Sequence, residues 1–137
     1  MTVAVVILNW NGEAHLRAFL PSVIAHSPGV DIVIADNGSA DGSEAYVATL
    51  PAVTWLGLRQ NWGFAEGYNR ALAQVEAEVF VLLNSDVRVT AGWMDAPLAK
   101  LRGDARVAAV QPKVLAHARP THFEYAGASG GYVDRLG

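Results

Sequence analysis

An unbroken apolar run, Val79–Leu83, passes directly into Asn84-Ser85-Asp86. A run of this length predicts a strand buried on both faces, as in a parallel sheet. Ligands of open α/β sheets bind outside the carboxyl ends of the strands, so Asp86 is expected where a metal ion or a phosphate would lie. An acidic cap on the following turn explains Asp86 equally well when this stretch is taken alone.

The composition excludes several classes of protein. The chain has 137 residues, of which 52% are hydrophobic, so it is long enough for one domain with a real core. The net charge is −3 and no basic run is present, so no nucleic-acid partner is expected. The absence of cysteine excludes disulfides, thiolate metal sites and a cysteine nucleophile. No apolar run approaches the length of a membrane span, and no signal peptide is predicted.

Apolar runs and helical patterns alternate along the chain. Strands are predicted at residues 3–8, 30–35, 53–58, 79–83 and 107–111, and helices at 13–26, 44–50, 64–75 and about 91–102. Pro21 is expected to kink the first helix or to mark a restart, and Ser43 or Asp41 to cap the second. This alternation predicts an α/β fold with a mainly parallel sheet.

The polar loops that follow the predicted strands share one edge of such a sheet. They comprise residues 9–12, 36–43, 59–63 and 84–86, and their convergence predicts a binding site. A dinucleotide site would need a glycine-rich first turn, but this turn contains Trp10. A Walker loop, a phosphoacceptor acid after the first strand and a Gly-x-Ser-x-Gly elbow are also missing. An Asp after the second strand and another after the fourth outline a site for a nucleotide-diphospho-sugar with a divalent ion.

Four motifs, at residues 8–12, 36–43, 61–69 and 83–87, resemble those of family 2 glycosyltransferases, most closely the rhamnosyltransferase-like branch. The resemblance implies the GT-A fold, a Rossmann-like three-layer sandwich with a mainly parallel sheet. Residues 1–112 would form the nucleotide-sugar-binding domain. Residues 113–137, rich in glycine, would begin a loop-rich extension on the acceptor side and are expected to be incomplete at Gly137.

The resemblance also implies roles for individual residues. The expected donor-nucleotide contacts are Asn9, Asn11, Asp36, Asn61, Gly63 and Asn84. Asp36 would contact the base, uracil or thymine, and Asn61 with Gly63 would lie near the ribose and diphosphate. Asn84 replaces the first acid of the family's Asp-x-Asp motif, and Asp86 matches the position that binds Mg²⁺ or Mn²⁺.

The implied activity is inverting transfer of a sugar from a UDP- or dTDP-sugar to a hydroxyl of a glycan or lipid-linked acceptor, in cell-envelope or surface polysaccharide synthesis. The general base would lie beyond Gly137, because neither Glu124 nor Asp134 matches it. A cytoplasmic location is expected, including the inner face of the membrane, with peripheral membrane association and homo-oligomers as further expectations. A non-catalytic nucleotide-binding fragment is the alternative, and a sugar-phosphate nucleotidyltransferase ranks lower because its glycine-rich first loop is missing.

Overall fold

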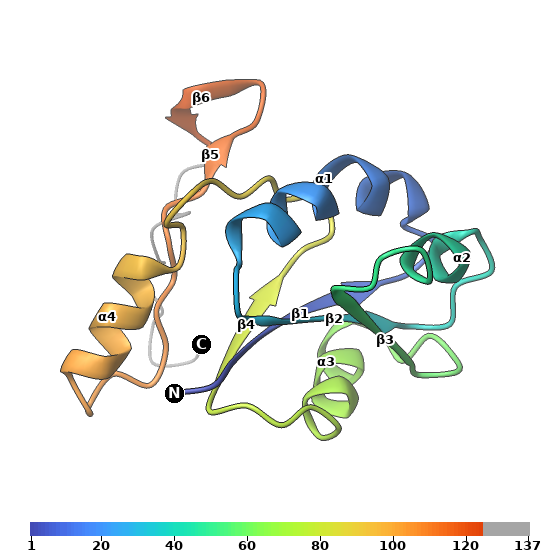
Figure 1. The fold of residues 1–137 in the computed structure, drawn as a ribbon, viewed down its shortest axis with the longest axis horizontal. Coiled ribbons are helices and arrows are strands. Elements are labelled where there is room, and N and C mark those ends of the chain that lie inside the picture. The colour runs from blue at the N-terminus through green and yellow to red at the C-terminus, as the bar shows by residue number, and fades with distance from the viewer. Residues whose placement is uncertain (125–137) are drawn as a thin grey trace, which may run out of the picture. The chain divides into compact units, whose positions relative to one another are not determined.

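A computed structural model describes residues 1–124 of the chain (Figure 1). The chain divides into two units, Met1–Ala91 and Gly92–Gly137. The first contains β1 (Val3–Asn9), α1 (Glu13–His26), β2 (Asp31–Asp36), α2 (Ser43–Val47), β3 (Val53–Gly57), α3 (Phe64–Leu72) and β4 (Val79–Leu83). The second contains α4 (Asp95–Gly103) and an antiparallel hairpin of β5 (Leu115–Ala116) and β6 (Arg119–Phe123).

The four strands of the first unit form one sheet in the order β3-β2-β1-β4, and every pair is parallel. The register places Asn9 beside Asp36, and Ile7 beside Leu83. Because the strands are parallel and in register, all four carboxyl ends lie at one edge. The loops that were predicted to share an edge therefore do so, and the expected α/β fold is confirmed.

Helices cover both faces of this sheet, as Figure 1 shows, with α1 and α2 on one side and α3 on the other. Strand residues alternate between the faces, because successive side chains of a strand point in opposite directions. Ala4 and Val6 of β1 pack with Tyr68 and Ala71 of α3. The intervening Val5 and Ile7 are equally buried and belong to the α1 side. The three-layer arrangement is thus a direct result of the apolar runs.

Helix α1 runs without interruption through Pro21, so the predicted restart does not occur. Its buried face consists of Leu16, Leu20 and Val23, which recur at helical spacing. Pro21 lies on the exposed side of the helix. It cannot donate to the carbonyl of Arg17, but on the exposed side water can take that donor's place.

The prediction that residues 79–83 are buried on both faces is wrong. β4 is an edge strand among the described residues, and the Leu82 side chain is 53% exposed. A continuous apolar run does not distinguish a central strand from an edge strand, because both need residues of high β propensity. The neighbouring Leu83, in contrast, is buried.

Several predicted boundaries also differ from the structure. Residues 107–111 form no strand within residues 1–124, and the strand that follows them, Arg119–Phe123, pairs with β5. The missing strand has a physical reason: a run of five apolar residues becomes a strand only where a neighbouring strand can form hydrogen bonds with it. The helices predicted at 44–50 and 64–75 end at Val47 and Leu72, where tighter turns continue the chain.

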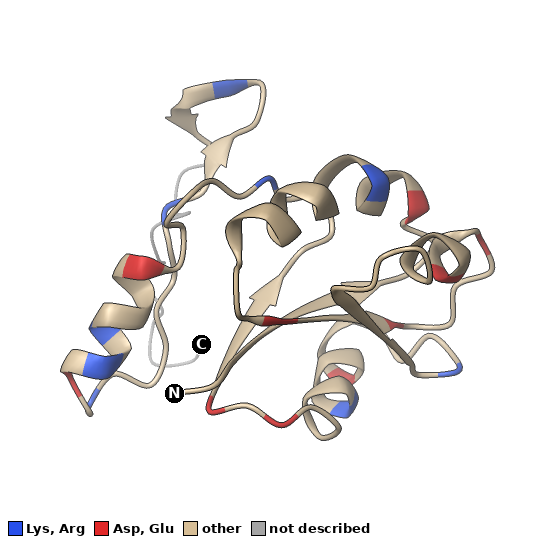
Figure 2. Cartoon of the chain, viewed as in Figure 1, with Lys and Arg blue, Asp and Glu red and all other residues tan. Residues whose placement is uncertain are grey.

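Charged residues are dispersed over helices and loops of the first unit (Figure 2). Two ion pairs each join residues one helical turn apart: Glu13 with Arg17 at 2.9 Å, and Glu66 with Arg70 at 2.8 Å. Such exposed pairs contribute only about 0.3–0.5 kcal/mol each, so the stability of the unit rests on the two apolar layers.

The difference in burial between Leu20 and Leu82 predicts that their replacement by alanine destabilises the fold to different degrees. Leu20→Ala should lower the free energy of unfolding by about 2–5 kcal/mol, because Leu20 is 1% exposed and its loss leaves a cavity. Leu82→Ala removes the same atoms from a side chain that is 53% exposed, and should cost less than about 1 kcal/mol. Urea unfolding followed by circular dichroism measures both, and equal losses would contradict the burial described here.

Candidate functional site

Two buried polar side chains, Asn9 and Asp36, end β1 and β2 side by side. They are 1% and 6% exposed. The Asn9 side-chain amide donates to Asp36 Oδ1 at 3.0 Å and to Ser39 Oγ at 3.1 Å. The Ser39 backbone N–H donates to Asp36 Oδ2 at 2.9 Å, and the Ser39 hydroxyl donates to Asp36 Oδ1. The carboxylate is therefore held in one orientation at the carboxyl edge of the sheet.

Asn11 joins the loop after β1 to the loop after β2. Its backbone N–H donates to Ser39 Oγ at 2.8 Å, and its side-chain oxygen accepts the backbone N–H of Ala40 at 2.8 Å. Asn11 is exposed and has a positive φ of 49°, a conformation that asparagine adopts more readily than most residues. The side-chain amide nitrogen of Asn11 lies at the surface of this edge.

Asn37, which the sequence analysis did not single out, ties the loop after β2 to the loop after β3. Its side-chain oxygen accepts the Trp62 backbone N–H at 2.9 Å, and its amide donates to Gly63 O at 2.9 Å and Asn61 Oδ1 at 3.2 Å. Asn61 Oδ1 also accepts the Gly63 N–H at 2.8 Å. Asn37 is 3% exposed. The only signal in the sequence was an Asn-Gly pair, which is also a common turn.

Two glycines allow these loops to meet. A Cβ on Gly38, which has a φ of 82°, would lie 2.7 Å from the Gln60 Cα atom. Gly63 has a φ of 77° and precedes the first residue of α3. A side chain at Gly38 would force the loops after β2 and β3 apart. A side chain at Gly63 would meet no atom within 4 Å, but its positive φ is one that glycine adopts without strain, so the backbone favours glycine at both positions.

The turn after β4 completes the edge. Asn84 and Asp86 are exposed and Ser85 is half-buried. The Tyr68 hydroxyl donates to the Leu83 carbonyl at 3.2 Å, which anchors α3 beneath the end of β4. Burial raises the pKa of the Tyr68 phenol, so it remains a donor at neutral pH. Asp86 and Asp36 thus extend from the same edge of the sheet.

The N-termini of α1 and α2 cap each other. Asp41 Oδ2 accepts the Glu13 N–H at 3.0 Å, and Glu13 Oε2 accepts the Gly42 N–H at 3.0 Å. Asp41 Oδ1 also accepts the Ser43 N–H at 3.0 Å, so the predicted cap from Asp41 is present. Partial desolvation raises the pKa of Asp41, but hydrogen bonds from Ser43 and Glu13 outweigh this effect and the net pKa is lowered.

Two aromatic side chains are exposed near this edge. Trp10, in the loop after β1, is 59% exposed, and Phe64, at the start of α3, is 67% exposed. Phe64 meets Tyr68 edge-on with ring centroids 5.1 Å apart. An exposed indole in a loop at this edge is suited to stacking on a planar ligand.

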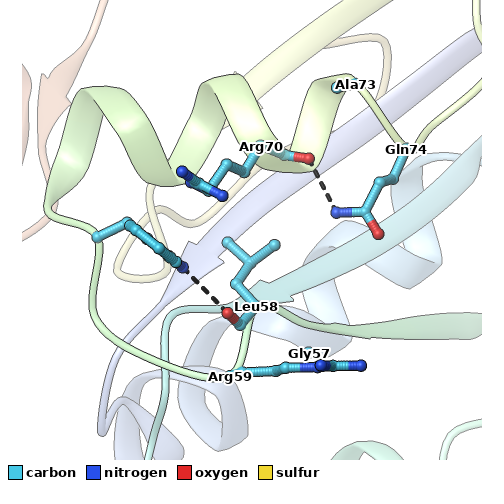
Figure 3. Close-up of a pocket in the computed structure, with 7 residues that line it drawn as sticks. Gly57, Leu58, Arg59, Arg70, Ala73 and Gln74 are labelled. Atoms are coloured by element: carbon cyan, nitrogen blue, oxygen red, sulfur yellow. Dashed lines mark hydrogen bonds between the residues drawn. The ribbon is translucent and has the colours of Figure 1, made fainter.

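A cavity of about 410 Å³ lies beside α3. Its walls, shown in Figure 3, are Gly57, Leu58, Arg59, Trp62, Arg70, Ala73 and Gln74. The Arg70 guanidinium lies 3.5 Å from the centre of the Trp62 ring, whose N–H donates to Leu58 O at 3.0 Å. Arg59 and Trp62 belong to the loop after β3, but none of the seven residues predicted to bind the donor nucleotide or the metal lines this cavity. The candidate site is therefore the group of oriented polar side chains at the strand ends.

A sequence model of the family described as "Glycosyl transferase family 2" matches residues 4–126, which is most of the chain. The chain belongs to glycosyltransferase family 2. An N-acetylglucosaminyl-diphospho-decaprenol L-rhamnosyltransferase from Mycobacterium tuberculosis is 30% identical over 123 residues, covering 80% of this chain and 40% of the relative.

Solved glycosyltransferase structures share the fold of this family 2 chain. S. aureus TarS 1–349 in complex with UDP-GlcNAc matches with a TM-score of 0.66 and 21% identity, over 75% of this chain and 32% of TarS. Mannosyltransferase PcManGT from Pyrobaculum calidifontis, in complex with GDP-Man and Mn²⁺, matches with a TM-score of 0.66 and 22% identity, over 77% of this chain and 33% of the other. The GT-A fold is thus confirmed, and the chain spans about two fifths of the curated relative's length.

The donor set at the edge is compatible with a hard divalent cation. Residues 1–124 contain no cluster of three or more His, Cys, Asp or Glu side chains able to enclose a metal ion. Asp86 is a single exposed carboxylate, and Mg²⁺ is commonly held by one or two carboxylates together with ligand phosphates. The residues present therefore fit a cation that a bound diphosphate helps to hold.

The two late acids weighed as general bases lie away from this edge in sequence. Glu124 is exposed in the second unit, and Asp134 lies outside the described residues.

The space around Asn9 predicts a selective effect of glycine substitutions. In Gly12→Ala the new methyl group would lie 2.4 Å from Asn9 Oδ1, so Asn9 must move and the free energy of unfolding should fall by about 1–3 kcal/mol. Gly57→Ala is the matched control, because the nearest atom to its methyl group is 3.7 Å away, and it should change stability by less than about 0.5 kcal/mol. Urea titration of the two variants measures the difference. A Gly12→Ala variant as stable as the control would contradict the close contact.

The capping role of Asp41 predicts a dependence of stability on pH. Since the folded-state pKa of Asp41 is lowered, its stabilising effect is present above the unfolded pKa of about 3.9 and is lost as pH falls through the folded value. Asp41→Asn should lower the melting temperature near pH 6, and the difference from wild type should shrink below about pH 4. Thermal unfolding across this range measures it. A difference that grows on acidification would rule out this assignment.

Proposed function

We propose that this chain forms the donor-binding part of an inverting glycosyltransferase that uses a UDP- or dTDP-sugar. The observation that carries the proposal is the oriented Asp36 carboxylate, which lies at the same sheet edge as the exposed Asp86. Ligands of parallel α/β sheets bind at this edge. Membership of family 2 and the nucleotide-sugar complexes of the structural neighbours support the same reading.

Asp36 would bind the base. Its Oδ2 atom accepts the Ser39 N–H and has a second lone pair available for a ring N–H of uracil or thymine. Asn9 is too buried to line the pocket and would act by holding Asp36. Asn11 would contact the ribose from the surface of the edge, and the exposed Trp10 would stack on the base.

The diphosphate would lie between the turn after β4 and the start of α3. Helix α3 begins at Phe64, and backbone N–H groups of its first turn favour an anion. Asn61 and Gly63 hold the loop that leads into this turn, and Asn84 would donate to a phosphate oxygen. Asp86 would hold Mg²⁺ or Mn²⁺, which neutralises charge that develops on the leaving diphosphate.

In the proposed reaction an acceptor hydroxyl attacks the anomeric carbon from the side opposite the nucleotide, so the configuration inverts. The residues of this chain bind and orient the donor for that attack. The general base that takes the hydroxyl proton would come from outside the described residues. A chain that binds the nucleotide without catalysis is the alternative, and transfer from a radiolabelled donor to an acceptor distinguishes the two.

A lipid-linked glycan is the acceptor class that the mycobacterial relative suggests, since that relative is named for a diphospho-decaprenol substrate. None of the helices in residues 1–124 is both long and apolar enough to cross a bilayer. Because the relative's printed name includes a lipid-linked substrate, we propose that this chain associates peripherally with the inner face of the membrane, in cell-envelope polysaccharide synthesis. The exposed Leu82 on the edge strand β4 supports the proposed self-association.

The proposal predicts metal-dependent binding of UDP or dTDP. Calorimetry should show tighter binding with Mn²⁺ than without it, and Asp86→Ala should abolish that gain while keeping the metal-free affinity. Asp36→Ala should weaken binding about ten- to a hundredfold with or without Mn²⁺, because hydrogen bonds to charged groups are worth about 1.5–3 kcal/mol.

Asp31→Ala is the matched control, because Asp31 is an exposed carboxylate at the opposite end of β2. It should bind as the wild type does. If neither nucleotide binds, or if Asp31→Ala and Asp86→Ala weaken binding equally, the proposed site is wrong.

A further inference from the structure

One buried polar atom at the strand ends has no hydrogen-bond partner within residues 1–124, the side-chain oxygen of Asn9. The Asn9 side chain is fixed in orientation, because its nitrogen donates to the carboxylate of Asp36, which can only accept when it is ionised. If the Asn9 amide were rotated so that its oxygen and nitrogen changed places, the Asn9 oxygen would face the Asp36 oxygen, and both can only accept. Buried acceptors without a donor are rare in folded proteins and cost free energy, so this oxygen calls for an explanation.

A hydroxyl that could donate to this atom belongs to Ser85, in the turn after β4. The register pairs Ile7 with Leu83, so Ser85 lies level with Asn9 on the neighbouring strand end. The side-chain oxygens of Asn9 and Ser85 lie 2.4 and 3.8 Å from the position that a Cβ atom on Gly12 would occupy. Because Gly12 has no side chain, nothing from that residue separates the two oxygens.

We propose that the Ser85 hydroxyl donates to Asn9 Oδ1 when the nucleoside diphosphate and its cation are bound. Asn9 then becomes a positioning residue, with its nitrogen on Asp36 and its oxygen on the residue before Asp86. This inference rests on the function proposed above. It assigns Asn9, Gly12 and Ser85 to a connection between the part of the site that would bind the base and the part that would bind the cation.

The connection has a thermodynamic consequence. A hydrogen bond that forms only when the nucleoside diphosphate and its cation are both bound adds its free energy to the joint binding of the two. By linkage, the cation then strengthens nucleotide binding by the same factor as the nucleotide strengthens cation binding. Loss of the Ser85 hydroxyl should reduce the factor by which the cation and the nucleotide strengthen each other's binding. It should leave the affinity for the nucleotide without metal unchanged.

The first test uses Ser85→Ala, with Ser85→Thr as the matched control that keeps a hydroxyl. Calorimetry with UDP should give wild-type affinity for both variants without Mn²⁺. With Mn²⁺, Ser85→Ala should bind about three- to tenfold more weakly, the value of one hydrogen bond, and Ser85→Thr should bind within about twofold of wild type. In Asn9→Ala, the further change Ser85→Ala should have no effect on affinity, because the acceptor is gone.

The second test does not require Asn9→Ala to fold. In ¹⁵N spectra of the full chain, Mg²⁺ with UDP should shift the Asn9 side-chain amide resonances of the wild type and of Ser85→Thr, and shift them less in Ser85→Ala. If Ser85→Ala matches the wild type in both affinity and shift, a buried water or another donor occupies this place and the inference is overturned. A wild type that binds no UDP overturns the proposed function, and this inference with it.

Discussion

The hydrogen bond between Asn9 and Asp36 depends on parallel pairing, and the rest of the edge depends on that bond. Parallel register brings the last residues of β1 and β2 side by side, where an asparagine and an aspartate bond instead of repelling each other. Ser39 binds both side chains and thereby fixes the loop that follows β2. A carboxylate that is 6% exposed keeps its orientation without help from a ligand, which is the kind of preorganisation that binding requires.

Asparagines connect the loops in turn. Asn11 joins the first loop to the second, and Asn37 joins the second to the third. An asparagine side chain both donates and accepts, so each can bond backbone groups of a loop other than its own. The three loops after β1, β2 and β3, which are distant in sequence, are therefore held as one surface.

The sequence predicted the architecture because period and composition are local properties. The apolar runs at residues 3–8 and 79–83 and the helix at 13–26 needed no knowledge of their neighbours. The failures were all matters of context. Whether Leu82 is covered, and whether residues 107–111 find a partner, depend on segments elsewhere in the chain. The role of Asn37 was not visible either, since the three partners of its side chain are set by the meeting of the loops after β2 and β3.

The central strand has a further consequence for how the chain acquires its structure. β1 pairs with β2 and with β4, and Glu78 at the start of β4 reaches back to accept the Thr2 N–H at 2.6 Å across 76 residues. During synthesis one side of β1 stays unpaired until most of the first unit has left the ribosome. Contacts of such high sequence separation close slowly, so the nascent chain exposes its most apolar segment for the longest time. Chaperone dependence would then be set by the order of the strands and not by the final stability of the sheet.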